Sequence, residues 1–105
     1  MRGLRATTAF TSSPAALAAC ADGTVRLIAN HLDVELEHLE VEVNGIVDVR
    51  GALGDDSVRV GFESMSLEIR LRAMPGTPAH LVDLIGPATE QLCIDLDTLR
   101  RGVPV

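Results

Sequence analysis

The feature that most constrains the fold is a strict alternation of apolar and polar residues between Phe62 and Met74. The apolar set is Met65, Leu67, Ile69, Leu71 and Ala73, and the residues between them are polar or charged. A period of two predicts a β-strand with one buried face and one face in water. Val34–Val49 contains the same alternation and predicts a second strand, in which we interpret Asn44-Gly45 as a bulge rather than a hairpin turn.

A helix is predicted before these strands. Ser12 or Ser13 can cap it, and Pro14 suits the first helical position because its missing N–H is not needed there. Within Ala15–His31, one stripe at spacings of three and four carries Leu17, Cys20, Thr24, Leu27, Ile28 and His31. Residues 1–12 show no periodicity and are predicted to be an irregular start.

Two further helices are predicted after the strands. Thr77-Pro78 repeats the start signal, and an apolar stripe follows it as far as Cys93. Gly86-Pro87 lies inside this stripe and predicts a kink or a break, because proline removes one backbone bond and collides with the preceding turn. Asp95–Arg101 is predicted to be a short helix, and Arg50–Gly61 is rich in glycine and aspartate, as loops are.

The expected architecture is therefore a single α+β domain over residues 1–105, with helices packed on an antiparallel sheet. Two recognised strands are marginally stable in water and leave unpaired edges. We expect a homodimer, in which a second copy completes the sheet.

Composition excludes several classes of function. The net charge of −6 gives no basic surface for nucleic acid, and Phe10 and Phe62 are the only aromatic residues available for base stacking. The acidic stretch Asp33–Glu42 is interpreted as the solvated side of a strand. The histidines and the two cysteines lack metal-ligand spacing, so we expect no metal and no cofactor. No apolar run is long enough to span a bilayer, and we expect a cytoplasmic protein without membrane contact.

The start of the chain leaves two other interpretations open. Residues 1–5 look like a charged leader, and Leu17–Cys20 resembles a lipoprotein cleavage site. The intervening stretch is too polar for the apolar core of a signal peptide. A transit peptide is the other alternative, because this stretch has arginine, serine and threonine but no acids.

Three segments resemble motifs of the OsmC/Ohr family, which comprises osmotically induced and organic hydroperoxide resistance proteins. Ser13–Cys20 resembles the cysteine-bearing start of the family's long central helix. Asp48–Gly54, with Val58–Phe62 after it, resembles a strand–loop–strand connection of OsmC-like proteins. Cys93–Val105 is the most specific match and resembles the second-cysteine motif and tail. The chain is identified on these segments as an N-terminally short OsmC-like member.

This resemblance implies a fold and an activity. The implied fold is an intertwined homodimer with a long central helix and a second, kinked helix on an antiparallel sheet. The implied activity is a peroxiredoxin-like thiol peroxidase that reduces organic hydroperoxides in oxidative stress. Cys20 would be the peroxidatic residue that becomes a sulfenic acid, and Cys93 would resolve it to a disulfide. A dithiol of the lipoyl type or another dithiol would then reduce the pair.

The chain departs from the family pattern near these residues. The strands that precede the central helix in family members are missing, and a catalytic arginine normally belongs to them. Arg2 and Arg5 are the nominal thiolate-stabilising replacements. Phe10 stands where the hydroperoxide resistance branch has a glutamate, and Ile94 replaces the usual proline after the second cysteine. From these departures we expect weak activity.

The residues near Cys20 in sequence do not activate it. Asp22 would disfavour a thiolate, and Arg26 does not share a helical face with Cys20. Taken without the resemblance, both cysteines could also be small buried apolar residues. Two other functions remain open: a catalytically weak or inactive dimeric protein that binds a small molecule or acts as a scaffold, and a lipid-anchored protein acylated at Cys20.

Overall fold

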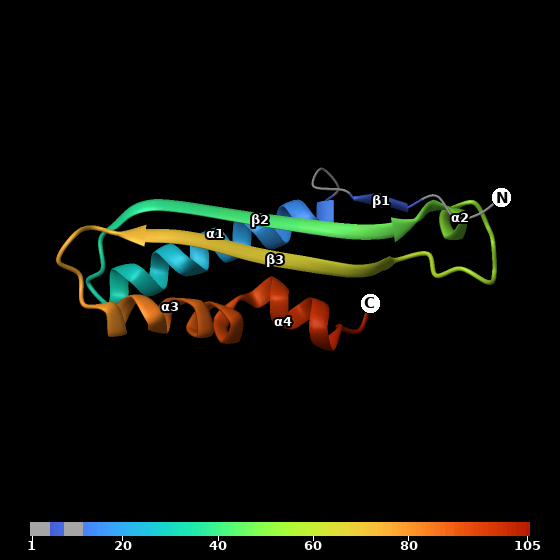
Figure 1. Ribbon diagram of the computed structural model, residues 1–105. Coiled ribbons are helices and arrows are strands. Elements are labelled where there is room, and N and C mark those ends of the chain that lie inside the picture. Colours follow the sequence, from blue (N-terminus) through green and yellow to red (C-terminus); the bar gives the residue numbers. More distant parts are fainter. Residues whose placement is uncertain (1–4, 8–11) are drawn as a thin grey trace.

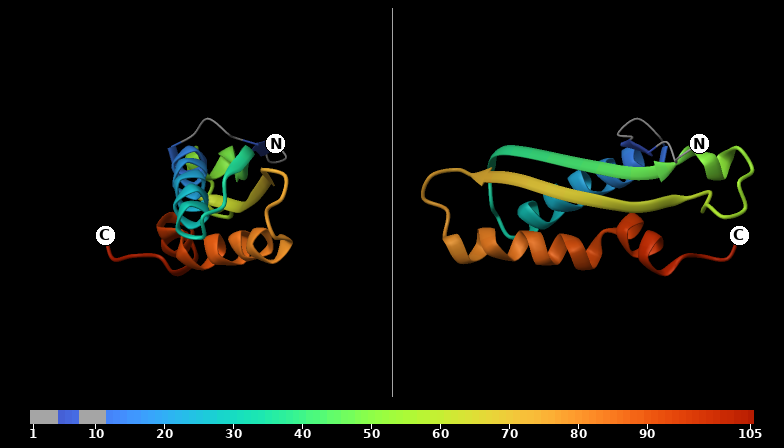
Figure 2. Two further views of the ribbon diagram at one scale, coloured as in Figure 1. Left: turned by 90° about the vertical axis from the view of Figure 1, so that its left-hand side faces the viewer. Right: turned by 45° about the vertical axis from the view of Figure 1, so that its right-hand side comes forward.

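The protein folds into two layers, a sheet and a set of helices on one of its faces. The computed structural model describes residues 5–7 and 12–105. Its elements in chain order are β1 (Arg5–Thr7), α1 (Ser12–His31), β2 (Leu36–Asp48), α2 (Val49–Ala52), β3 (Phe62–Ala73), α3 (Ala79–Leu92) and α4 (Ile94–Arg101). Figure 1 and Figure 2 show α1, α3 and α4 on the same side of the long β2–β3 ribbon. The predicted α+β architecture and its helical layer are confirmed.

The sheet is antiparallel in the order β1-β2-β3, and β2 and β3 form its long central ladder. The register pairs Glu40 with Arg70 on this ladder. The expected bulge at Asn44-Gly45 is not there, since both residues pair regularly; the register shifts lie between Leu36 and His38 and between Ile46 and Val47. Gly45 has a different role: a Cβ on it would lie 2.7 Å from the ring of Phe62. A side chain at position 45 would collide with this ring, so the close approach requires a glycine.

Two segments expected to be irregular form regular elements. Residues 5–7, predicted to belong to an irregular start, pair with the end of β2 as β1. Residues 50–52, predicted to be loop, and Val49, predicted to end a strand, form the single turn α2. Asp48 caps that turn by accepting a hydrogen bond from the Arg50 backbone N–H at 3.1 Å, and it also accepts from the Arg50 guanidinium at 2.8 Å. Sequence reasoning missed the turn because it contains Gly51 and is followed by Gly54, Asp55 and Asp56, a composition typical of a loop.

Of the kink or break expected at Gly86-Pro87, the break does not occur, since α3 continues through Pro87. The carbonyl that loses its partner to Pro87 belongs to Asp83, and both residues are exposed. Water can therefore bond that carbonyl, which removes much of the cost of the missing N–H. On the buried side of the helix, the Thr89 hydroxyl donates to the Ile85 carbonyl at 2.8 Å.

The core between the layers has two parts. The first cluster comprises Leu17, Ala21, Val43, Cys93 and Leu96. The second comprises Val25, Ala29, Val34 and Ile85, with partly buried apolar residues from β2, β3 and α3 around it. Both are built from small and aliphatic side chains, as the shortage of aromatic residues requires.

The other face of the β2–β3 ladder is charged and open to water. Arg70 lies 3.0 Å from Glu40, 3.1 Å from Glu42 and 2.8 Å from Glu68. Arg72 pairs with Glu37 at 3.1 Å. These ion pairs confirm the interpretation of the acidic stretch as the solvated side of a strand. Being exposed, they contribute little stability individually.

Candidate functional site

The two cysteines, 73 positions apart in the chain, meet in the first core cluster. The Cys93 thiol donates to the Cys20 sulfur over 3.5 Å. Both are free thiols; Cys20 is partly buried and Cys93 has no exposed surface. A movement of about 1.5 Å would bring the sulfurs to bonding distance. The structure therefore brings together the two residues that the sequence singled out as a pair.

The backbone at Cys93 positions this meeting. Cys93 ends α3, with its N–H donating to the Thr89 carbonyl at 2.9 Å, and it also precedes the first residue of α4. Its extended conformation, with φ −71° and ψ 116°, turns the chain between the two helices. The first N–H groups of a helix have no partner within the helix. At α4 these groups belong to Ile94 and Asp95, and they face the sulfur of Cys20.

These N–H groups hold the pKa of the Cys20 thiol below its ordinary value. The main cause is the hydrogen bond from the Asp95 backbone, with further bonds from the Cys93 thiol and the Ile94 backbone. Burial and the negative charge of the Asp95 carboxylate act in the opposite direction and are weaker together. Donors directed at a sulfur stabilise its thiolate, the nucleophilic form.

Cys93 has the opposite character. Burial raises the pKa of its thiol above the ordinary value, and its bond to the Cys20 sulfur acts in the same direction. In the pair, Cys20 is thus the favoured thiolate and Cys93 the favoured proton donor. This difference in pKa suits a pair in which one cysteine is the nucleophilic thiolate and the other stays protonated beside it.

Sequence reasoning located the activating groups outside helix α1 but did not identify them. Asp22 and Arg26 pair with each other at 2.8 Å, and neither is a main influence on Cys20. The activating element is the start of α4. Two aspartates in its first turn and Arg100 and Arg101 in its last turn mark a helix that begins directly after Cys93. This charge pattern was the sequence signal that could have pointed to the start of α4 as the activating element.

Of the two candidate arginines, the structure describes only the backbone of Arg5. Arg2 lies outside the described residues. The backbone of Arg5 pairs with Asp48 at one end of β2, whereas the first core cluster takes Val43 from that strand. Five residues of strand separate these positions, or about 17 Å. Among the side chains of residues 13–105, no arginine is a main influence on Cys20. A thiolate-stabilising role for Arg2 or Arg5 stays a prediction.

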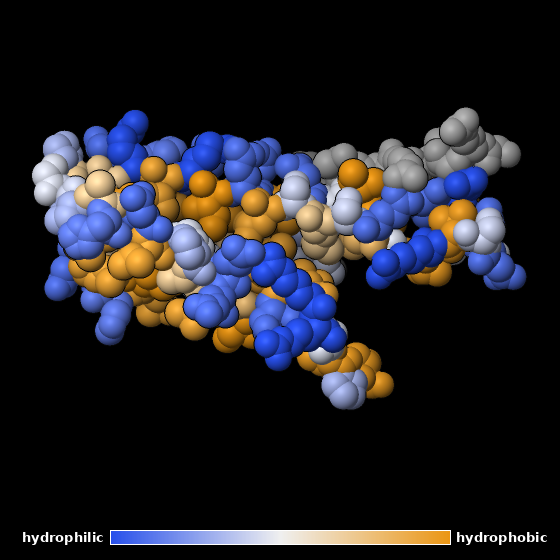
Figure 3. All heavy atoms as spheres, turned by 60° about the horizontal axis from the view of Figure 1, so that its bottom comes forward, coloured by the Kyte–Doolittle hydropathy of each residue, from blue (hydrophilic) through white to orange (hydrophobic). Residues whose placement is uncertain are grey.

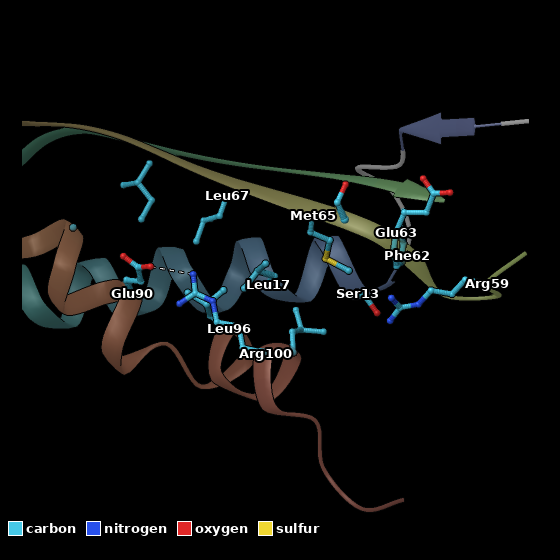
Figure 4. A pocket seen from close by; sticks show the side chains of 14 residues that line it. Ser13, Leu17, Arg59, Phe62, Glu63, Met65, Leu67, Glu90, Leu96 and Arg100 are labelled. Atoms are coloured by element: carbon cyan, nitrogen blue, oxygen red, sulfur yellow. Dashed lines mark hydrogen bonds and ion pairs between the residues drawn. The ribbon is translucent and has the colours of Figure 1, made fainter. Parts of the chain in front are cut away.

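A groove of about 620 Å³ lies next to the pair, between β3 and the helices (Figure 4). Its apolar lining consists of Leu17, Phe62, Met65, Leu67, Ile69, Leu96 and Leu99. Its polar side chains include Arg59 and the ion pair of Arg100 with Glu90 at 3.0 Å. Neither cysteine lines it, but Leu17 and Leu96 separate it from them, since both belong to the cluster that contains Cys93.

Three other possibilities are a metal site, a membrane span and a lipid anchor. Residues 5–7 and 12–105 contain no group of three or more histidine, cysteine, aspartate or glutamate side chains that could hold a metal. No helix there is long and apolar enough to cross a membrane. Helix α1 runs unbroken through Cys20, so the cleavage required by the lipid-anchored alternative would remove its first two turns.

Fold and site together define an α+β domain with a pair of adjacent, unequal thiols at the junction of its helices. The model of the OsmC-like protein family matches residues 8–105, and the chain belongs to that family. Among solved structures, it is similar to an OsmC-like protein from Mycoplasma pneumoniae, with a TM-score of 0.67 and 12% identity over 97% of this chain and 89% of that one. At that identity the likeness shows the fold. No curated protein matches the sequence.

Proposed function

We propose that the protein is a thiol peroxidase that reduces organic hydroperoxides, with Cys20 as the peroxidatic residue and Cys93 as the resolving one. Membership in the OsmC-like family, which includes peroxidases, supports the class of reaction. The observation that carries the assignment of roles is the 3.5 Å contact between the two sulfurs. Backbone N–H groups of α4 act on both sulfurs, but they outweigh burial at Cys20 and are outweighed by burial at Cys93.

In the first step, the Cys20 thiolate attacks the terminal oxygen of the hydroperoxide. The O–O bond breaks, the alkoxide leaves and takes up a proton, and the sulfur becomes a sulfenic acid. The N–H groups of Ile94 and Asp95 hold the attacking thiolate in place. They provide, without a guanidinium, part of the stabilisation that an arginine would give.

In the second step, the Cys93 sulfur attacks the Cys20 sulfur and water leaves, which gives a disulfide. Cys93 needs no diffusion, because the two sulfurs are already in contact. It must lose a proton, and burial has raised the pKa of its thiol. We therefore assign the pH-sensitive step to resolution. A dithiol reductant, lipoyl-type or other, then returns two electrons and two protons.

The proposal includes a homodimer. For about 100 residues a compact domain has a radius of gyration near 13 Å, whereas this chain has 16.7 Å and extends over 55 × 28 × 18 Å. Figure 3 shows apolar side chains spread over the side where α3 and α4 lie. Leu84, Leu92 and Leu99 are exposed there, and β3 is an edge of the sheet. A second copy that covers this side would complete the core.

The proposal also includes a reducing compartment, the cytoplasm. A cysteine pair that cycles between dithiol and disulfide needs a pool of reduced dithiol, and such pools are maintained there. In this setting the protein would act in the response to oxidative stress.

The test is a titration of thiols against peroxide. The reduced protein is treated with one equivalent of cumene hydroperoxide, and free thiols are counted before and after. We expect both thiols to be lost per peroxide consumed, with the disulfide mapped to Cys20 and Cys93. Retention of both thiols with the peroxide intact would contradict the proposal and favour a binding or scaffold role. Sedimentation of a folded species at the mass of one chain would contradict the dimer.

A further inference from the structure

We propose that reductants attack this protein at Cys20, so that Cys93 is always the sulfur that leaves when the disulfide opens. The inference rests on the proposed cysteine chemistry but concerns a step that the peroxide does not enter. A disulfide has two sulfurs, and which one is attacked decides where the reductant becomes attached.

Access separates the two sulfurs. Cys93 has 0% of its surface exposed, whereas Cys20 is partly open. Cys93 is enclosed by members of its own cluster, including Leu17, which is 2% exposed, and Leu96, which is 9% exposed. A thiolate must approach along the axis of the S–S bond, behind the sulfur it attacks. At Cys93 that approach passes through packed side chains.

The stability of the leaving thiolate favours attack at Cys93 instead of Cys20. This effect must be weighed against the difference in access. Cys20 is the more stable thiolate and would be the better leaving group if Cys93 were attacked. Rates of thiol–disulfide exchange change by about threefold for each unit in the pKa of the leaving thiol. Complete burial prevents the encounter until the core opens, and a well-packed core opens rarely. Access therefore decides.

The exchange proceeds in two balanced steps. The thiolate of a dithiol reductant attacks the Cys20 sulfur, a mixed disulfide forms, and the bond to Cys93 breaks. Cys93 leaves with the electron pair and takes up a proton, which its burial favours. The second thiolate of the reductant then attacks the reductant's own sulfur in the mixed disulfide. Cys20 leaves, stabilised by the N–H groups of α4, and the reductant is released as its cyclic disulfide.

The test maps the attachment site with a reagent that cannot complete the second step. The disulfide is formed with diamide, so that peroxide turnover is not involved. Limiting glutathione, a monothiol, is then added and free thiols are blocked with N-ethylmaleimide. The chain has no lysine, so trypsin releases Cys20 in residues 6–26 and Cys93 in residues 73–100. We expect glutathione on Cys20 in at least a tenfold excess over Cys93.

Glutathione on Cys93 in equal or greater amount would overturn the proposal, and so would the failure of diamide to join the two cysteines. A result on Cys20 in a protein that does not consume cumene hydroperoxide would keep this inference and refute the peroxidase. A second variant tests the cause. Leu96→Ala should uncover Cys93 and raise its share of glutathione severalfold, whereas Leu53→Ala, at a residue already 77% exposed, should leave the ratio unchanged.

Discussion

The two halves of the core are made of similar residues and do different things. Around Ile85 and Val25, helices α1 and α3 and the ladder enclose a purely aliphatic cluster. Around Cys20 and Cys93, the layer changes from α3 to α4, and the start of a helix is directed into the cluster. The first half can only stabilise the fold. The second half has the same dense packing but adds backbone N–H groups, and that addition gives one of its sulfurs a distinct reactivity.

The largest expected effect lies in the second half. Cys20→Ser should lower peroxide consumption by at least roughly a thousandfold, because the nucleophile itself is removed. Cys93→Ser should retain the first step and stop after one turnover, with a sulfenic acid on Cys20 that dimedone traps. Multiple turnovers by Cys20→Ser with a dithiol reductant, measured by loss of cumene hydroperoxide, would show that the peroxidatic role is assigned wrongly.

A smaller effect tests the first half. Ile85→Ala should lower the free energy of unfolding by about 2–5 kcal/mol, since Ile85 is 0% exposed and its removal leaves a cavity. Leu27→Ala is the matched control: Leu27 is 71% exposed on α1, and the expected loss is below about 1 kcal/mol. Urea unfolding measures both. If the division between the halves holds, the alkylation rate of Cys20 in folded Ile85→Ala equals that of wild type.

The pH dependence of alkylation tests the difference between the two thiols. The pKa of Cys20 is lowered by the N–H groups of α4 and that of Cys93 is raised by burial. The reaction of Cys20 with iodoacetamide should therefore lose half its rate at a lower pH than the same thiol in urea. For stability the sign follows: the thiolate of Cys20 contributes above its unfolded pKa, and this contribution is lost as the pH falls through the folded value. Identical profiles in the folded and unfolded protein would remove the basis for α4 as the activating element.

The smallest effect concerns the side chain of Asp95. The backbone N–H of Asp95 stabilises the Cys20 thiolate, whereas the carboxylate of the same residue destabilises it. Asp95→Asn should speed alkylation of Cys20 near neutral pH by a few-fold at most, because a partly exposed charge acts weakly. Asp97→Asn, in the same turn but paired with Arg101 at 3.0 Å, should leave the rate unchanged. Equal responses of the two variants would mean that the general charge of the helix start matters and not this carboxylate.

Sequence reasoning found the parts of this molecule that repeat with a simple period. The alternation up to Met74 and the stripe through Leu17 and Cys20 each mark one face of one element, so strands and helices followed. Periodicity does not show how far a weak turn or strand extends, and α2 and β1 were therefore missed. Pro87 was expected to kink or break α3, and the helix is not broken; the exposure of Pro87, which decides the energetic cost, depends on the tertiary fold.

The site shows the same limit. Each cysteine was recognised from its own local motif, and neither motif describes the distance between them. The activation of Cys20 comes from residues at positions 94 and 95, which lie next to it only after α1 and α4 have packed. A contact of this kind depends on the closing of the whole fold.

The distance along the chain between the two contacting sulfurs has a thermodynamic consequence. A disulfide between them would close a loop of 73 residues. In the chain-entropy account, such a crosslink restricts the unfolded chain and makes unfolding costlier by about 4 kcal/mol, a large share of the stability of a domain this size. The reduced protein, which is the form that meets peroxide, is then the less stable of the two. Each oxidation would stabilise the fold, and each reduction would return the protein to the form that is more sensitive to heat and proteolysis.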